Sequence, residues 1–423
     1  MLDIHFVRDN TERVQQELDK RGMLFDLAAF MALDQKRRAA IARLDDHRAE
    51  LNAASEGFSQ LADEVKDGER KRLKELKAKI ATGEYELKDI EEEWTRGLLQ
   101  LPNMSHESVP VGPDSSGNVV VKKVGNAPVF SFAPLGHQDV PAIKQCIDLD
   151  RGAKISGSRF WYLKGPLARL ALALMHYALD FYASKGFEPM MVPMLVKESA
   201  MIGTGFFPAD KNEIYTVNPD EDNLFLVGTA EVALASYHMD ECVDLSHGPI
   251  RYAGFSSCFR REAGTYGKDL HGIIRGHQFN KVEMFIFCRP EDSWREHEFL
   301  LQCSEEFLQS LGLHYQVLNM CTGDIGAPNA KKYDIETWMP GSQMYRETNS
   351  CSNDTDFQAR RLHCTYRDAI GKQQHAHTLN NTGCADLRTM IALIETYQQE
   401  DGSVLIPPAL QPYCGFDMIS VQR

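Results

Sequence analysis

Residues 258–283, CFRREAGTYGKDLHGIIRGHQFNKVE, decide how we expect this chain to fold around a ligand. Polarity alternates on both sides of a polar centre, which predicts two strands joined by a long turn. Arg260 closes one face of the first strand, and Phe279, Lys281 and Glu283 share one face of the second. A cation, a ring and a carboxylate would then converge over a floor of small side chains. That floor consists of Gly254, Ser256 and Cys258.

The alternative for this stretch is a charged hairpin with a solvated tip. Glu283 argues against it, because it directly precedes the apolar run 284–287. We expect this carboxylate to be largely buried, and a buried charge needs a partner. The stretch is therefore a candidate ligand site.

Length and composition limit the number of domains and the kinds of ligand that we expect. The chain has 423 residues, of which 43% are hydrophobic and 25% charged, so we expect one large and one smaller globular domain. A net charge of -14 excludes a global basic field and restricts any nucleic-acid contact to local patches. The ten cysteines form no C-x-x-C pair, which favours a reducing compartment and no zinc site. Without a signal peptide, transit peptide or long apolar run, we expect a cytoplasmic protein with no membrane span.

Residues 27–101 carry the periodicity of a coiled coil. Two runs, 41–58 and 73–101, advance by alternating steps of three and four residues and are separated by Asp67-Gly68 and its surroundings. This pattern predicts an antiparallel helical hairpin. With roughly 35 residues per helix, the arm would be about 50 Å long.

The predicted tip of this arm is basic. Residues 66–79 include seven basic side chains and three acidic ones, whereas residues 91–93 are all glutamate. A basic tip on an acidic protein suits a phosphate backbone. The alternative is an ordinary solvated face laced by i,i+4 ion pairs. The candidate contacts are Arg70, Lys71, Arg72 and Lys74.

A proline-rich stretch, 102–141, places a domain boundary near residue 103. We therefore expect an arm domain at 1–103 and a second domain at 104–423. Helices are expected at 167–184 and 388–399. Further strands are expected at 225–227, 332–340, 343–351 and 375–384.

Two polar positions in this second domain have competing interpretations. Thr229 and Glu231 follow a predicted strand and either line a site or simply cap a short helix. Arg388 begins a helix, where a cation is slightly unfavourable unless an anion binds there. The chain has no phosphate-binding glycine motif, so any nucleotide must be held by arginines.

Together these segments resemble the seryl-tRNA synthetases, a class II aminoacyl-tRNA synthetase family. The likeness spans nearly the whole chain in the family's order. It rests on the arm, the opening stretch, and SGSRFWYLKG (156–165), GFEPMMVPMLV (186–196), GTAE (228–231), YRETNSCSNDTDFQARR (345–361), HTLNNTG (377–383) and ETYQQEDGSVLIPPAL (395–410).

The resemblance implies an α+β fold, with a class II antiparallel sheet flanked by helices and an N-terminal antiparallel coiled-coil hairpin. It implies a homodimer formed through the segment containing Pro193, and an arm that grips tRNA(Ser). The implied reaction joins L-serine to ATP as seryl-adenylate and then to the 3′-terminal adenosine of the tRNA. ATP and Mg²⁺ are the implied cofactors, and whether tRNA(Sec) is a second substrate stays open.

The resemblance also assigns residues. Arg260 would hold the ATP α-phosphate and the substrate carboxylate, Glu283 would face serine, and Arg388 would bind the γ-phosphate; these three are the catalytic candidates. The serine pocket would comprise Thr229, Ala230, Glu231, Arg260, Glu283, Asn380 and Thr382. The ATP site would comprise Arg260, Arg261, Glu262, Phe279, Glu347, Thr348, Asn349, Ser350 and Arg388. Glu347 and Ser350 would hold Mg²⁺ with ATP. We expect the loop 265–276 to be mobile until ATP or the tRNA end binds.

Two positions depart from the family's common pattern. Gly228 stands where proline is frequent, and Asp386-Leu387 stands where the family often has glycine. These departures motivate one alternative, a non-catalytic relative that binds RNA through the arm. A second alternative, an inhibitor-tolerant duplicate that still charges serine, cannot be separated by sequence.

Overall fold

The computed structural model describes residues 1–58, 62–263 and 272–421. The chain divides into two compact units, one comprising Leu2–Asp19 and Met23–Pro102, the other Met1, Lys20–Gly22 and Asn103–Arg423. Most of the loop 265–276, which the sequence predicts to be mobile, lies outside the described residues.

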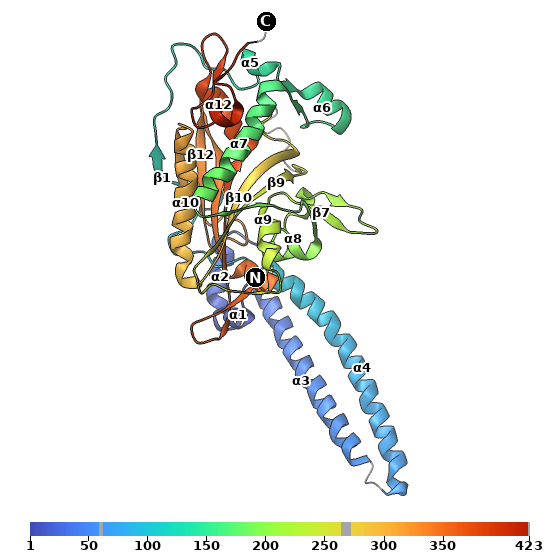
Figure 1. Ribbon diagram of the computed structural model, residues 1–423. Helices are drawn as coiled ribbons and strands as arrows, with labels where there is room; N and C mark the ends of the chain where they lie inside the picture. The colour runs from blue at the N-terminus through green and yellow to red at the C-terminus, as the bar shows by residue number, and fades with distance from the viewer. Residues whose placement is uncertain (59–61, 264–271, 422–423) are drawn as a thin grey trace. The chain divides into compact units, whose positions relative to one another are not determined.

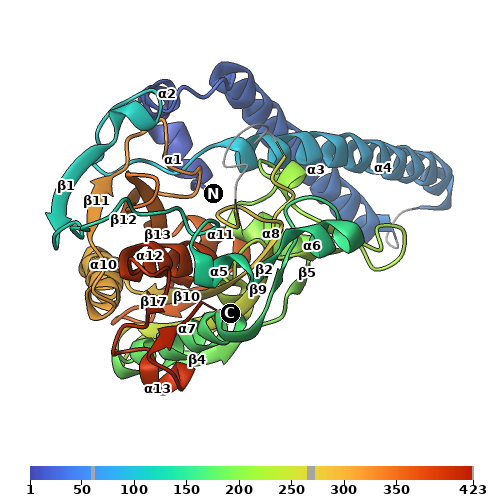
Figure 2. The same cartoon turned by 90° about the horizontal axis from the view of Figure 1, so that it is seen from above.

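The smaller unit is helical. Its short helices are α1 (Ile4–Asp9) and α2 (Thr11–Lys20), and its long ones are α3 (Leu27–Gly57) and α4 (Asp63–Gln100). Helices α3 and α4 lie side by side as a hairpin (Figures 1 and 2). Their 31 and 38 residues correspond to roughly 45 and 55 Å. The predicted coiled-coil hairpin is confirmed.

Ion pairs between α3 and α4 establish their antiparallel register. Arg37 pairs with Glu91 at 2.9 Å, Arg48 with Glu84 at 2.7 Å, and Arg72 with Glu50 at 2.6 Å. As one residue number rises, its partner's number falls. Within the predicted seam, Leu44, Leu76 and Ile90 are buried. The other leucine and isoleucine positions of the two runs are mostly half-buried, namely Ile41, Leu51, Leu73, Ile80 and Leu87.

The larger unit is built on an eight-stranded sheet in the order β1-β11-β12-β13-β16-β10-β9-β4. Every neighbouring pair is antiparallel except β4 with β9, which is parallel. The strands are β1 (Val119–Val124), β4 (Glu188–Met191), β9 (Ile250–Phe259), β10 (Gln278–Cys288), β11 (Tyr315–Asn319), β12 (Lys331–Met339), β13 (Met344–Thr355) and β16 (His377–Ala385). The predicted strands all occur, and the proline-containing β4 lies at an edge, as proline requires.

Helices cover both faces of this sheet. They are α7 (Gly165–Ser184), α8 (Glu198–Thr204), α9 (Glu231–Ala235), α10 (Ser293–Ser310), α11 (Phe357–Leu362) and α12 (Asp386–Tyr397). The large core joins α7, α10 and α12 to the face of β10 that carries Val282, Met284 and Ile286 (Figure 2). Phe285 and Phe287 point the other way, to α9 and α11. Lys281 and Glu283 share that second face, so the candidate site lies opposite the large core.

The remaining elements are short. They include α5 (Pro141–Lys144), β2 (Ile147–Asp148), α6 (Leu149–Ser156), β3 (Tyr162–Leu163), β5 (Leu195–Lys197), β6 (Thr216–Val217), β7 (Leu224–Leu226), β8 (Cys242–Val243), β14 (Thr365–Arg367), β15 (Gln373–His375), β17 (Val404–Leu405), α13 (Gln411–Cys414) and β18 (Met418–Ile419). All ten cysteines are free thiols. In the described part of the chain, no helix combines the length and apolarity needed to cross a bilayer.

Several register shifts interrupt the sheet, and two of them, in β16 and β13, bear on the candidate site. In β10–β16, Val282 faces Cys384 and Glu283 faces Thr382, so Gly383 is the extra residue. In β12–β13, Ile335 faces Asn349 and Glu336 faces Glu347, so the extra residue is Thr348. An extra residue reverses which side chains share a face. The first bulge therefore puts Ala385, opposite Lys281, on the same face as Thr382, and the second puts Glu347 on the same face as Ser350.

Gly383 is needed at its bulge because Tyr182 lies against it. A Cβ on this residue would lie 2.6 Å from the Tyr182 ring, whose hydroxyl donates to the Gly383 carbonyl at 2.8 Å. Tyr182 is fully buried and cannot move aside. We expect Gly383→Ala to lower the free energy of unfolding by about 1–3 kcal/mol, the usual cost of overpacking a core.

Thermal and urea denaturation measure this effect. Gly68→Ala is the control, because Gly68 lies in an exposed part of α4 and a Cβ there meets nothing within 4 Å. The control should be neutral or slightly stabilising. Equal stability of Gly383→Ala and wild type would show that the bulge does not need glycine.

Candidate active site

The pairing of β9 with β10 confirms the predicted arrangement of the opening stretch. Phe279 lies opposite Cys258, Lys281 opposite Ser256, and Glu283 opposite Gly254. The small residues on β9 leave room above the long side chains of β10. Only Arg260 falls outside the strands, one residue beyond the end of β9.

Glu283 is buried, as predicted, and has the partners that a buried charge needs. It is 1% exposed and forms an ion pair with the Lys281 ammonium, itself 6% exposed. The Thr229 hydroxyl donates to Glu283 Oε2 at 3.1 Å. The solvated-hairpin alternative is therefore wrong for this part of the stretch.

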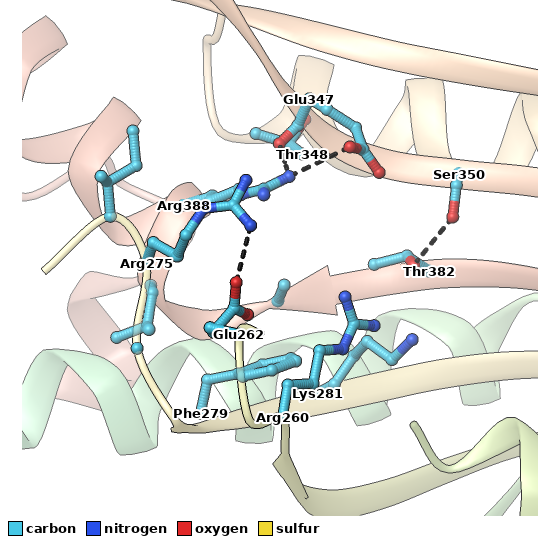
Figure 3. A pocket seen from close by; sticks show the side chains of 14 residues that line it. Arg260, Glu262, Arg275, Phe279, Lys281, Glu347, Thr348, Ser350, Thr382 and Arg388 are labelled. Atoms are coloured by element: carbon cyan, nitrogen blue, oxygen red, sulfur yellow. Dashed lines mark hydrogen bonds and ion pairs between the residues drawn. The ribbon is translucent and has the colours of Figure 1, made fainter. Parts of the chain in front are cut away.

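A cavity opens over this face (Figure 3). Glu347, Thr348 and Ser350 of β13 lie on one side, and Arg260, Phe279 and Lys281 lie on the other. The other lining residues are Glu262, Ile274, Arg275, Gly276, Thr382, Ala385, Leu387 and Arg388. Segments more than 100 residues apart in the chain thus form one concave surface.

The cavity has a positive lining. Three arginines and Lys281 outnumber the two carboxylates, Glu262 and Glu347. Arg388 Nη1 donates to the Glu347 carbonyl at 2.7 Å and to its Oε2 at 3.2 Å, and Arg275 Nη1 donates to Glu262 Oε2 at 2.7 Å. The excess of positive charge favours a polyanion, and planar guanidinium groups suit phosphate oxygens.

Arg260 is the exposed cation of this lining. Its Nε donates to the Gly228 carbonyl at 3.3 Å, and its guanidinium carbon lies 5.3 Å from the centre of the Phe279 ring. Within the described residues, neither terminal nitrogen of Arg260 has a hydrogen-bond or ion-pair partner. Its strongest donors are therefore free for a ligand.

Glu347 is held in its ionised form. Burial alone would raise its pKa, but Arg388, Lys332 and Arg260 together lower the pKa to about 2. The group is thus a carboxylate throughout the physiological pH range. A permanently ionised oxygen ligand beside a phosphate-binding cavity fits Mg²⁺, which usually takes one or two carboxylates and completes its shell with phosphates and water.

The apolar part of the lining lies around the Phe279 ring. Ile274 and Leu387 contribute the other apolar side chains there. A half-buried ring next to a guanidinium offers a flat surface on which a base can stack. This region can therefore take the aromatic end of a ligand whose anionic end binds the arginines.

A cluster of acidic and polar side chains, most of them buried, adjoins the cavity. It begins at Thr382, whose hydroxyl lies 3.4 Å from that of Ser350, and continues to Glu283 and Thr229. Glu231 Oε1 accepts from Gln358 Nε2 at 2.8 Å and from Asn380 Nδ2 at 3.3 Å. We call Thr229, Glu231, Glu283, Asn380 and Thr382 the acidic pocket.

The charge of this pocket depends on pH. Burial, together with the nearby Asp354 and Glu283 carboxylates, raises the pKa of Glu231 to about 8. Since Lys281 already pairs with Glu283, the pocket has more acids than cations. It is therefore suited to an incoming ammonium group.

Most predicted site residues belong to the cavity lining or to the acidic pocket, but Asn349, Arg261 and Ala230 belong to neither. The Asn349 side chain is 1% exposed and donates to the backbone carbonyls of Thr382 and Gly383, which ties β13 to β16. Thr348 is the extra residue of the bulge, so Asn349 faces away. Arg261 is solvent-exposed and does not line the cavity. Ala230 is fully buried beneath the pocket.

The two interpretations of Thr229 are both partly right. Its hydroxyl accepts from the Glu231 backbone N–H at 3.2 Å and donates to Glu283, so it supports the start of α9 while lining the acidic pocket. The formal N-cap of α9 is Ala230, which makes no side-chain capping bond. Arg388 lies in the first turn of α12, as predicted, with Glu347 as its partner.

The structure shows what the two departures from the family pattern contact. The Gly228 backbone carbonyl accepts a hydrogen bond from Arg260, and this bond does not depend on which side chain stands at position 228. Asp386 accepts from both the backbone and the side-chain nitrogen of Asn280, at 3.0 and 2.9 Å, which fixes the start of α12 against β10. Leu387 adds an apolar side chain to the cavity.

The alternation of the opening stretch placed Lys281 on the candidate face, and the structure confirms that position, although the family resemblance assigned it no role. Neither line of reasoning assigned Arg275 to the site. Arg275 follows the long turn, where no periodic signal places it. Asp354, which lies behind Asn380, gave no sequence signal either.

Comparisons with known proteins agree with this geometry. Residues 1–105 match the seryl-tRNA synthetase N-terminal domain, and residues 215–397 match the class II tRNA synthetase core domain (G, H, P, S and T). A serine–tRNA ligase of Thermodesulfovibrio yellowstonii is 42% identical over 425 residues, covering 99% of this chain and 100% of that protein.

Two solved structures are also similar over the full chain. Seryl-tRNA synthetase from Pyrococcus horikoshii complexed with ATP is 39% identical, with a TM-score of 0.92 and 100% coverage of both chains. The cytoplasmic serine–tRNA ligase of Naegleria fowleri in complex with AMP is 34% identical, with a TM-score of 0.87, and covers 100% of this chain and 99% of its own.

The buried Lys281–Glu283 pair predicts a measurable stability effect. Lys281→Met leaves the Glu283 charge buried without its partner, which should cost about 3–5 kcal/mol of unfolding free energy. Adding Glu283→Gln should recover part of that loss, because the uncompensated charge is then removed.

Lys211→Met is the control for this experiment. Lys211 lies 3.9 Å from Glu198 in an exposed pair, so its loss should cost less than about 1 kcal/mol. Urea denaturation compares the variants. If Lys281→Met and Lys211→Met lost the same stability, the Lys281–Glu283 pair would contribute no more than an exposed ion pair.

Proposed function

The chain belongs to the seryl-tRNA synthetase family, and we propose that it activates L-serine with ATP and transfers the seryl group to tRNA(Ser). The observation that carries this proposal is the junction of two oppositely charged sites at Thr382 and Ser350. A polyanion fits the positive cavity, and an amino acid's ammonium fits the acidic pocket. A serine–ATP pair would meet at the junction.

In the first step, a serine carboxylate oxygen attacks the α-phosphorus of ATP. The P–O bond to the β-phosphate breaks, and seryl-adenylate and pyrophosphate form. Such in-line transfer needs positioning and charge stabilisation rather than a covalent nucleophile. Arg260, at the junction, neutralises the carboxylate and the α-phosphate, while Arg388 binds the γ-phosphate.

The base would stack on Phe279, with Glu262 beside it. Because Arg275 holds Glu262, this carboxylate has a fixed direction from which to accept a hydrogen bond. Glu347 and Ser350 would hold the Mg²⁺ that accompanies ATP. That ion supplies charge neutralisation on the phosphates when bound.

The acidic pocket would recognise serine. The Glu231 and Glu283 carboxylates bind the ammonium, while the threonine hydroxyls and Glu283 are available to the serine hydroxyl. Alanine leaves these buried groups unpaired, a penalty that reaches about 10⁴-fold in sites of this kind. Threonine must be excluded by size, since one methyl group contributes only about 1–3 kcal/mol.

In the second step, a 2′- or 3′-hydroxyl of the tRNA's terminal adenosine attacks the seryl carbonyl, and AMP leaves. The arm unit, 1–103, would bind the tRNA and the unit 104–423 would catalyse. In the structure, Arg70 pairs with Asp67 and Arg72 with Glu50 and Glu69, and all of these side chains except the half-buried Glu69 are exposed. Exposed pairs are weak, so these arginines remain available to phosphates.

We also propose a cytoplasmic homodimer. Its interface would lie along β4, an edge strand on which Met191 is 81% exposed. An exposed apolar edge strand is a liability that a second subunit can cover. The alternative functions remain a non-catalytic RNA-binding relative and an inhibitor-tolerant duplicate. The free Arg260 donors and the ionised Glu347 favour an active enzyme over the non-catalytic alternative.

A serine-dependent ATP–pyrophosphate exchange assay tests the proposal. We expect exchange in the wild type and a loss of at least about 10²-fold in kcat/KM for Arg260→Ala, because one preorganised donor to the transition state is removed. Arg367→Ala is the control, since Arg367 is exposed, lies outside the cavity lining, and donates a hydrogen bond to the Gly371 carbonyl. Wild-type exchange no higher than that of Arg260→Ala would refute an active enzyme.

The arm can be tested separately. Replacing Arg70, Lys71, Arg72 and Lys74 with alanine should raise the KM for tRNA and make that KM less sensitive to added salt, while pyrophosphate exchange stays unchanged. Lys88→Ala with Arg96→Ala removes basic charge nearer the other end of α4 and serves as control. Equal loss of exchange and charging would show that the tip is not a tRNA contact.

A further inference from the structure

Asp354 is a fully buried carboxylate that the proposed mechanism does not use. It lies near the end of β13, is 0% exposed, and has no cation among its hydrogen-bond partners in the described part of the chain. Its Oδ1 accepts from Asn329 Nδ2 at 2.6 Å, and its Oδ2 accepts from Asn380 Nδ2 at 3.0 Å. A charge buried on neutral partners alone is expensive, so its presence calls for a reason.

The reason lies in the second bond of Asn380. The same Nδ2 group that donates to Asp354 also donates to Glu231 Oε1 at 3.3 Å. The amide is thus held between two carboxylates, one behind the acidic pocket and one within it. Turning the amide over would bring its oxygen against both carboxylates, so Asp354 locks the orientation of Asn380.

This lock also directs Glu231. Gln358 and Asn380 both donate to Oε1. In the parts of the chain that the structure describes, no donor reaches Oε2. The Gln358 amide is fixed in turn, because its oxygen accepts from the Thr378 hydroxyl at 2.9 Å. Glu231 therefore keeps one oxygen for a ligand.

We propose that Asp354 is a positioning residue for amino-acid binding, which acts through Asn380 to hold Glu231 as the acceptor of the substrate's ammonium group. This inference rests on the proposed function, since the ligand is the ammonium of serine. Asp354 touches no substrate. It supplies orientation and a negative potential from behind the pocket.

The charges around this unit make its effect pH-dependent. Burial raises the pKa of Asp354 to about 7, against the opposing effect of Asn329, and that of Glu231 to about 8. Glu283 and Lys281 face Glu231 from β10, and the Met1 amino group faces Asp354. At pH values below these pKa values, the Asp354 and Glu231 carboxyl groups are protonated and neutral. An ammonium group binds better once they lose their protons, so serine affinity should rise as pH increases from 6 to 8.5.

Asp354→Asn tests the proposal in the full-length enzyme by pyrophosphate exchange. At pH 8.5 we expect the KM for serine to rise about tenfold or more, because Asn380 loses the charged acceptor that fixes its amide. The KM for ATP should stay almost unchanged. At pH 6 the difference should shrink, which flattens the pH profile of the serine KM. Asp356→Asn is the matched control: its carboxylate accepts from Arg360 at 2.7 Å, outside the acidic pocket, and its profile should match wild type.

A folded Asp354→Asn variant with a wild-type serine KM and pH profile would overturn the inference. So would an equal rise in the KM values for serine and ATP. If wild type itself lacks serine-dependent exchange, the proposed function fails, and this inference with it. Exchange by wild type and an unaffected variant would refute the inference alone.

A measurement on the wild type covers the case in which the variant does not fold. Calorimetric titration with seryl-sulfamoyl-adenosine at pH 7, in buffers of different ionisation enthalpy, reports protons exchanged on binding. We expect net proton release that AMP alone does not cause. Binding of the seryl compound without proton release would overturn the inference.

Discussion

The buried ion pair between Lys281 and Glu283 constrains everything placed around it. Both groups lose their hydration on the inner face of β10, and their attraction compensates only when further hydrogen bonds satisfy them. Thr229 supplies one such bond from the turn before α9. The small side chains of β9 leave the space for it. The pair therefore determines which elements must approach this strand, and how closely.

The bulges in β16 and β13 bring polar residues of the site onto one face of the sheet. Under strict alternation, Ala385 would lie on the opposite face from Asn380 and Thr382. For the same reason, Glu347 would lie on the opposite face from Ser350. One extra residue in each of β16 and β13 reverses the alternation at the point where the site begins. The same strands thus supply apolar residues to the large core and polar residues to the cavity.

Alternation and heptads explain why much of this could be predicted from the sequence. The faces of β9 and β10 and the helical hairpin follow from local periodicity, and the family resemblance located most of the site. The sequence placed Asn349 in the ATP site, but it does not line the cavity because one bulge residue turns it away. Asp354 escaped because its partners, Asn329 and Asn380, are distant in sequence and meet it only through the strand register. Local patterns contain no information on such meetings.

The boundary between the two charged regions gives a zwitterion one orientation. An amino acid whose ammonium enters the acidic pocket must direct its carboxylate away from Glu231 and Glu283. Lys281 is already paired with Glu283, so the exposed cation that can receive the carboxylate is Arg260, which lines the adjoining positive cavity. The carboxylate is thereby aimed at the place where an α-phosphate would bind, before any catalytic group acts. Positioning of this kind lowers the barrier by removing the entropy of alignment from the chemical step.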